Sequence, residues 1–182
     1  MVELLKEIRT RRSGRAFDTR PVPQEMIDSI IEAGRWAPSC MNAQEWNFIV
    51  LNDPIVLEKA HDALSRGNAY GKRAPVMLLV VTREGGGCGA HNLPYWMMDV
   101  GLATANILLQ AFHLGLLAHP TAGWNEVELI DILDIPEGYR IGTVIFIGYE
   151  GNIEDLDELT QEKERRTRTR KTLEEVLHVN GW

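Results

Sequence analysis

Two uninterrupted apolar runs of strand length constrain the fold of this chain more than any other feature. The first run is VMLLVV, at residues 76–81, and the second is TVIFIGY, at residues 143–149. A strand with one face in water alternates apolar and polar residues, whereas a strand in a sheet covered on both faces is apolar throughout. The two runs therefore predict buried strands in a sheet with other elements packed against it.

Helical patterns alternate with the strand patterns along the chain. Apolar residues recur at helical spacing between Pro23 and Gly34, and Asp53 followed by Pro54 has the residue types of a helix start. Helices are predicted at residues 2–12, 23–37, 53–65, 95–114, 126–133 and 172–178, and a further strand at residues 46–51. This alternation predicts an α/β or α+β fold. The helix at 95–114 is apolar almost all round, which predicts burial in the fold or at a subunit interface.

Length and charge exclude several classes of protein. A chain of 182 residues without a linker rich in Pro, Gly or Ser is predicted to form a single domain, residues 1–182. The net charge of −7 argues against a nucleic-acid partner, because such proteins need a basic surface. The longest apolar stretch, residues 97–117, contains Asp99 and His113 and is too polar for a membrane span. No signal segment is recognisable, so a cytoplasmic location is expected.

The cysteines and histidines do not predict a metal site or a disulfide framework. The two cysteines, Cys40 and Cys88, are too few for either, and reduced thiols are expected. The five histidines are scattered without metal-ligand spacing, so no metal is expected. Residues 85–90 satisfy the GxGxxA pattern of dinucleotide-binding turns, but no helix opens directly after them. A flexible loop explains these glycines better.

Arginines gather near both ends of this acidic chain. Residues 11–15 have the sequence RRSGR, and residues 165–171 have the sequence RRTRTRK. Arginine binds phosphate through bidentate, charge-assisted hydrogen bonds, and a serine hydroxyl can complete such a cradle. The alternation of arginines at 166, 168 and 170 suits an extended segment with one basic face. By itself, each segment is explained better by a solvated charged surface.

Two polar loops offer groups for a flat heteroaromatic ligand. In residues 37–46, APSCMNAQEW, Asn42 and Gln44 offer both donors and acceptors. In residues 119–124, HPTAGW, Gly123 allows a ligand to approach the backbone closely. Both loops are also compatible with ordinary turns.

In combination, these segments resemble the FMN-dependent nitroreductase family. The resemblance is carried by RRSGRAFDTRPVP, AGRWAPSCMNAQEWNFIV, AHPTAGW, IPEGYRIGTVIFIGY and RTRKTLEEVLH, in this order, across about residues 8–178. It implies an α+β fold with a central mixed sheet flanked by helices, and a long buried helix at the interface of a homodimer. Each of two FMN molecules would contact both chains.

The resemblance also implies the roles of individual residues. The phosphate and ribityl end of FMN would be held by Arg11, Arg12, Ser13, Arg168 and Arg170, and the pyrimidine edge by Arg15. The partner chain would supply Pro38, Ser39, Cys40 and Asn42, with Gln44 nearby. The backbone of Ala122 and Gly123 would lie near flavin N5, and Asn68 or Lys72 would contact the ring.

The implied reaction has two half-reactions at one site. NAD(P)H would pass a hydride to flavin N5, and an electron-poor acceptor such as a nitroaromatic or a quinone would then be reduced in its place. No catalytic side chain is expected, because the flavin carries the chemistry. The alternatives are a protein that binds or senses FMN without turnover and a specialised member of the same fold, such as a reductive dehalogenase.

Overall fold

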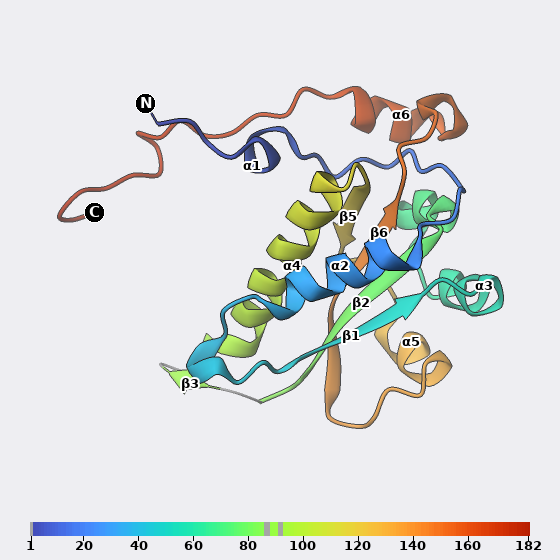
Figure 1. Cartoon of the computed structure of the whole chain (residues 1–182), viewed down its shortest axis with the longest axis horizontal. Helices are drawn as coiled ribbons and strands as arrows, with labels where there is room; N and C mark the ends of the chain where they lie inside the picture. The colour runs from blue at the N-terminus through green and yellow to red at the C-terminus, as the bar shows by residue number, and fades with distance from the viewer. Residues whose placement is uncertain (1, 86–87, 91–92) are drawn as a thin grey trace.

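The computed structural model describes residues 2–85, 88–90 and 93–182 (Figure 1). Its main sheet has four strands in the order β1-β2-β6-β5. These strands are Trp46–Leu51 (β1), Val76–Arg83 (β2), Tyr139–Gly148 (β6) and Leu117–Thr121 (β5). A separate two-stranded ribbon is formed by Gly89–Ala90 (β3) and Leu93–Pro94 (β4). The predicted strands at 46–51, 76–81 and 143–149 are confirmed, although β6 begins earlier than expected.

The sheet is antiparallel at each pairing of its four strands, which corrects the expected mixed sheet. The end of β1 lies beside the start of β2, with Leu51 opposite Met77. The connection between them, Pro54–Asp62 (α3) and the 3₁₀ segment Arg66–Arg73 (η2), therefore returns the chain to the same end of the sheet. A chain that re-enters at the same end must run antiparallel to the preceding strand.

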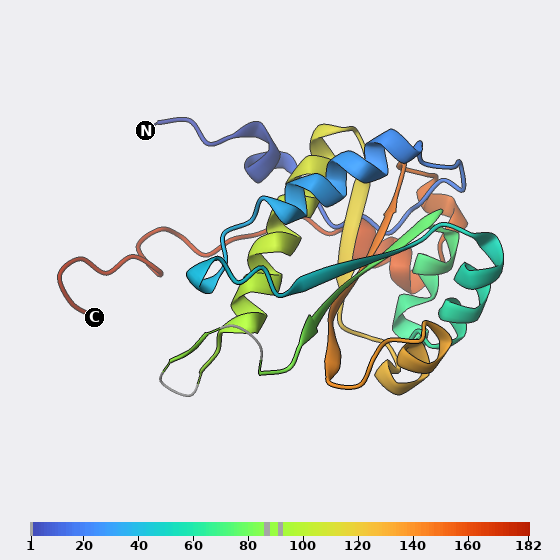
Figure 2. The same cartoon turned by 60° about the horizontal axis from the view of Figure 1, so that its bottom comes forward.

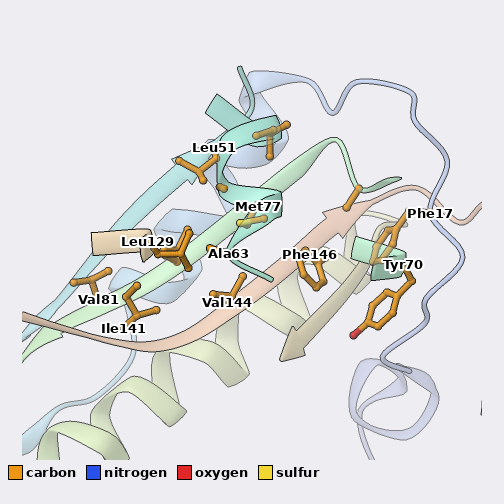
Figure 3. Packing of buried hydrophobic residues seen from close by; sticks show 14 of the residues in the cluster. Phe17, Leu51, Ala63, Tyr70, Met77, Val81, Leu129, Ile141, Val144 and Phe146 are labelled. Carbon is orange, nitrogen blue, oxygen red and sulfur yellow. The ribbon is translucent and has the colours of Figure 1, made fainter. Parts of the chain in front are cut away.

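Both faces of the sheet are covered, as the apolar runs predicted. Side chains of β2 alternate between the faces: Met77, Leu79 and Val81 belong to one core cluster, and Val76, Leu78 and Val80 to the other. The first cluster includes residues of α3 and of Glu126–Ile132 (α5), and Figure 3 shows its packing around Phe146. The second includes residues of Gln24–Arg35 (α2) and Tyr95–His113 (α4). Figure 2 shows the sheet between these two helix layers.

Helix α4 buries only one side in this single chain. Ala103, Ile107 and Ala111 are fully buried against the second core cluster, whereas Gly101 and Ala105 are exposed. Met97 and Met98, near its start, are about half exposed. Helix α4 is apolar on all sides, and the core of one chain explains only the apolar residues on its buried side.

The two ends of the chain depart most from the sequence-based predictions. The first helix is limited to Lys6–Thr10 (α1) and has no buried residue. The predicted helix at 172–178 is wrong, because these residues contain only a turn at 174–176 and are exposed. With nothing to pack against, so short a segment does not repay helix nucleation. A helix not predicted, Glu158–Arg165 (α6), is capped by Asp157. Short 3₁₀ turns lie at Cys40–Asn42 (η1) and Ile153–Asp155 (η3).

Candidate functional site

The two arginine-rich segments lie side by side, although about 150 residues separate them in sequence. The Arg168 guanidinium donates hydrogen bonds to the backbone carbonyls of Arg9 and Arg11. The Arg12 guanidinium donates to the carbonyls of Glu164 and Arg166, at 3.0 and 3.1 Å. These bonds hold the extended segment after α6 against the segment after α1, which gathers Arg11, Arg12, Ser13, Arg168 and Arg170 into one arginine cluster.

Arg11 differs from the other arginines of the cluster because it is partly buried, whereas Arg12, Arg168 and Arg170 are exposed. It is half-buried, and its guanidinium donates to the Ser13 hydroxyl at 3.3 Å. Burial, reinforced by the neighbouring charges of Arg168 and Arg170, lowers the pKa of Arg11. No described ion pair joins these three arginines to a carboxylate. Mutual repulsion among them would be relieved by an anion, and a phosphate matches the geometry that guanidinium groups recognise.

Arg15 is neutralised within the chain, unlike Arg11. Its side chain pairs with the Glu164 carboxylate at 3.3 Å, and its backbone N–H donates to the same carboxylate at 3.2 Å. The Arg15 guanidinium also lies 5.7 Å from the centre of the Tyr70 ring. Arg15 therefore connects the arginine cluster to a second group of residues.

This second group is a buried polar network around Tyr70 and His119. The rings of Tyr70 and His119 lie 5.0 Å apart, and His119 Nδ1 is 3.1 Å from the Gly14 carbonyl. The Tyr70 hydroxyl donates to Asn68 Oδ1 at 3.3 Å, and Asn68 Nδ2 donates to the Gly123 carbonyl at 2.8 Å. Burial lowers the pKa of His119 to about 4, so this imidazole is neutral at physiological pH.

The residues expected as a loop at 119–124 begin inside β5, which ends at Thr121, and the network fixes the backbone that follows this strand. The Gly123 carbonyl also accepts a hydrogen bond from the Ser65 backbone N–H, at 3.1 Å. A Cβ atom at Gly123 would lie 2.3 Å from Ser65 Oγ, so only glycine fits here without rearrangement. Ala122, its neighbour, is exposed. Lys72 points to a different partner, the Asp62 carboxylate at 3.7 Å.

The other predicted site residues form a loop beside the first turns of α4, away from the arginine cluster. This loop, residues 38–44, contains Pro38, Ser39, Cys40, Asn42 and Gln44 and is called the 38–44 loop below. The Cys40 backbone N–H lies 3.2 and 3.3 Å from the two carboxylate oxygens of Asp99, which is buried in the first turns of α4. The Gln44 backbone N–H donates to the Ser39 hydroxyl at 3.0 Å.

A pocket of about 360 Å³ opens beside the 38–44 loop. It is lined by Pro38, Ser39, Cys40, Tyr95, Met98, Asp99 and Leu102. The arginine cluster lies instead near α1, which contacts the far end of α4 where Glu7 Oε1 and His113 Nδ1 lie 3.0 Å apart. Figure 1 shows the two ends of α4 with α1 and the 38–44 loop well separated. Within one chain, the two halves of the predicted site, the 38–44 loop and the arginine cluster, therefore lie apart from each other.

Comparison with known proteins places the chain in a family. The Nitroreductase family profile matches residues 8–96. A protein from Methanothermobacter thermautotrophicus, named NADH dehydrogenase/NAD(P)H nitroreductase, is 34% identical over 153 residues, which cover 81% of this chain and 78% of that protein. The chain belongs to the nitroreductase family. A pig protein named iodotyrosine deiodinase 1 is 34% identical, over 85% of this chain and 64% of its own length.

A solved structure extends the likeness of this nitroreductase-family chain to its whole length. The crystal structure of an oxidoreductase containing FMN superposes with a TM-score of 0.88 and 29% identity. The superposition covers 100% of this chain and 93% of that one. The nitroreductase-like fold is thus confirmed, including the terminal segments that hold the arginine cluster.

The cysteines correct a prediction made from the sequence. Cys40 and Cys88 form a disulfide, with Cα atoms 5.8 Å apart, and are not reduced thiols. Their sequence separation of 48 positions hid this pairing. The fold brings them together because the 38–44 loop and the residues after β2 both lie at the start of α4. Disulfides need this Cα separation, which sequence spacing does not reveal.

Sequence reasoning also missed Tyr70, Glu164 and Asp99 as site residues, and the role of His119. No local pattern distinguishes a buried tyrosine or an ion-paired glutamate from others of their kind. Asp99 carried the only signal, as an acidic residue in an apolar helix. In the part of the chain that the structure describes, no group of side chains could hold a metal ion, and no helix is long and apolar enough to cross a bilayer.

Proposed function

We propose that this chain is an FMN-dependent oxidoreductase that takes a hydride from NAD(P)H and reduces an electron-poor small molecule, such as a nitroaromatic or a quinone, by a ping-pong mechanism. The observation that carries the proposal is the arginine cluster, in which half-buried Arg11 faces Arg168 and Arg170 without a described acidic partner. Family membership and the FMN-containing structural relative support the same conclusion. The alternatives are a binding protein without turnover and a reductive dehalogenase.

The residues present fit FMN in charge and shape. A phosphate placed among Arg11, Arg168 and Arg170 would neutralise guanidinium groups that now repel one another. Ser13 would add a hydroxyl, and Arg12 would keep the two segments together through its bonds to backbone carbonyls. At the other end of the network, Gly123 has no side chain, and the Ser65 and Asn68 side chains occupy that space and lie against its backbone.

The chain's own residues bind and orient the reacting partners. When bound, FMN supplies the two-electron chemistry that amino-acid side chains lack. Arg15 would hold the pyrimidine edge and stabilise negative charge there, while Glu164, already paired with Arg15, limits the strength of that effect. The hydrogen bonds from Asn68 and Ser65 keep the Ala122–Gly123 backbone in place. Protons can come from solvent, so no side chain needs to act as a general acid.

The complete site requires two chains, and we propose a homodimer. The 38–44 loop lies at one end of α4 and the arginine cluster near the other, so in this arrangement a partner's loop would complete each site. The exposed side of α4, with Gly101, Ala105 and Met98, is suited to an apolar interface. Trp36, at the end of α2, is 72% exposed beside a groove of about 540 Å³. Such apolar exposure is typical of a contact surface.

An absorbance spectrum tests this function directly. The purified protein, loaded with FMN and kept without oxygen, should lose its blue absorbance band when NADPH or NADH is added. The band should return when a quinone or nitroaromatic follows. A flavin that stays oxidised with both nucleotides would favour the binding protein, and recovery only with a halogenated phenol would favour the dehalogenase. A protein that takes up no FMN would overturn the proposal.

A further inference from the structure

The Cys40–Cys88 disulfide ties the 38–44 loop to the rest of the chain. Cys88 lies directly before β3, in the connection between β2 and α4, and Cys40 lies in the 3₁₀ turn of the loop. Both residues are only partly buried. A small thiol in solution therefore has access to this end of the molecule, and exposed disulfides are the ones that exchange readily.

The backbone of the loop is held in a conformation that its residues disfavour. Met41, Asn42 and Gln44 have φ angles of 50°, 57° and 53°, in the left-handed region. Three such residues without a glycine among them are unusual within five positions, and Met41 and Gln44 gain nothing from this region. Strained backbone of this kind persists only where surrounding contacts impose it.

The contacts that impose this left-handed conformation on the 38–44 loop converge on Cys40. Within the described residues, the hydrogen bonds of Ser39, Asn42 and Gln44 stay inside the loop. In the part of the chain that the structure describes, the hydrogen-bonded and covalent links from the loop to other elements are those from the Cys40 N–H to Asp99 and the disulfide to Cys88. Loss of the disulfide would leave one bifurcated hydrogen bond, with both distances longer than 3 Å, as the polar link between the strained loop and α4.

We propose that this disulfide is a redox switch that controls cofactor binding through the 38–44 loop. A thiolate of an external dithiol attacks one sulfur of the Cys40–Cys88 bond and forms a mixed disulfide. The second thiol of the reductant then attacks that mixed disulfide. The external dithiol is oxidised to a disulfide, and Cys40 and Cys88 gain two electrons and two protons as free thiols. The loop then relaxes from its left-handed conformation and no longer presents Pro38, Ser39 and Asn42 for binding.

This inference rests on the proposed function, because the role of the loop in FMN binding belongs to that proposal. The first measurement is independent of it: amide hydrogen exchange of residues 39–44, which follow Pro38, in FMN-free protein, oxidised and after treatment with dithiothreitol. Reduction should raise exchange in the loop by about tenfold or more, while β2 and β6 stay protected. A thiol titration of the unfolded protein should count no free thiol before reduction and both cysteines after it.

The second measurement is the dissociation constant of FMN for the two forms. Reduction should raise it by about tenfold. The matched control is Cys88→Ser, which removes the tether without touching the loop or the arginine cluster. This variant should show the exchange and the affinity of the reduced protein, and dithiothreitol should change neither.

The outcomes separate the two proposals. If oxidised protein binds FMN and reduction changes neither exchange nor affinity, the switch is wrong and the proposed function stands. Free thiols that persist under mild oxidation would also refute the switch. If neither form binds FMN, the proposed function fails, and hydrogen exchange still decides whether the disulfide holds the loop.

Discussion

At the scale of single residues, Arg11 differs from its neighbours in the partners of its guanidinium group. Arg12 and Arg168 donate to backbone carbonyls and join the two ends of the chain, whereas Arg11 donates to Ser13 and faces two other cations. Arg11 is thus the arginine best placed to bind an anion. Arg12 and Arg168 also join the two segments, and Arg170 donates to the carbonyl of the adjacent Thr169.

Replacing Arg11 with alanine should weaken FMN binding by about 10- to 100-fold, because it removes charge-assisted bonds to phosphate. The measurement is a fluorescence titration of FMN-free protein. Riboflavin, which lacks the phosphate, serves as the matched ligand, and its affinity should hardly change. Arg83→Ala, at the exposed end of β2, controls for the loss of a positive charge. An equal loss for FMN and riboflavin would place Arg11 away from the phosphate.

His119 should make the stability of the protein depend on pH. Burial lowers its pKa to about 4 from 6.5, so the unfolded chain binds a proton at pH values where the folded one does not. The stabilisation is complete above pH 6.5 and is lost as the pH falls. Between about pH 7 and pH 4.5 this group should cost the FMN-free protein about 2 kcal/mol of unfolding free energy.

Urea unfolding at the two pH values measures this cost. The comparison variant is His119→Asn, which does not titrate and whose amide can still donate to the Gly14 carbonyl. Carboxylates also contribute to acid destabilisation, so the test is the difference between the two proteins. A parent protein that loses no more stability than His119→Asn would show that folding does not lower the pKa of His119.

At the scale of elements, the sequence predicted those helices and strands whose position depends on the residues within them or directly before them. The β2 strand followed from its apolar run, and α3 began where Asp53 and Pro54 indicated, with the Asp53 carboxylate accepting from the N–H groups of Ile55 and Val56. The start of α6 carried the same kind of signal in Asp157, which was overlooked among the charges around it. The helix expected at 172–178 failed because periodicity does not say whether a surface is available to pack against.

Helix α4 leads to a prediction about assembly. Gly101 is exposed, and a Cβ atom there would meet nothing within 4 Å, so one chain tolerates a larger residue. Gly101→Glu should leave the fold intact and weaken dimerisation by about a hundredfold or more, because an unpaired carboxylate would be buried at the interface. Sedimentation velocity measures the change, with Val127→Glu, at an exposed position of α5, as the control. If Gly101→Glu remains a dimer, α4 is not the interface.

At the scale of the whole molecule, the candidate site depends on contacts that no local pattern encodes. The arginine segments were recognisable separately, but only folding shows that Arg168 bonds to the backbone of residues 9–11. The links between Tyr70 and His119, and between Cys40 and Cys88, likewise span about 50 residues. Family resemblance was enough to name the residues of the site from the sequence. Only the structure showed that the arginine cluster and the 38–44 loop lie near different ends of α4.

This division predicts complementation between two defective chains. One chain carries Arg11→Ala and Arg170→Ala, and the other carries Pro38→Glu, at an exposed position of the loop. Each homodimer has a defect in both sites and should bind FMN poorly. In the mixed dimer, one site combines both defects, and the other combines an intact arginine cluster with an intact partner loop.

Different affinity tags on the two chains allow the mixed dimer to be isolated, and its FMN content can be read from absorbance. If the partner's loop completes each site, the mixed dimer should hold about one FMN, because one of its two sites is free of substitutions. If each site were built from a single chain, both sites of the mixed dimer would carry a defect and it would be as empty as its parents. The FMN count of the mixed dimer therefore distinguishes a shared site from a site within one chain.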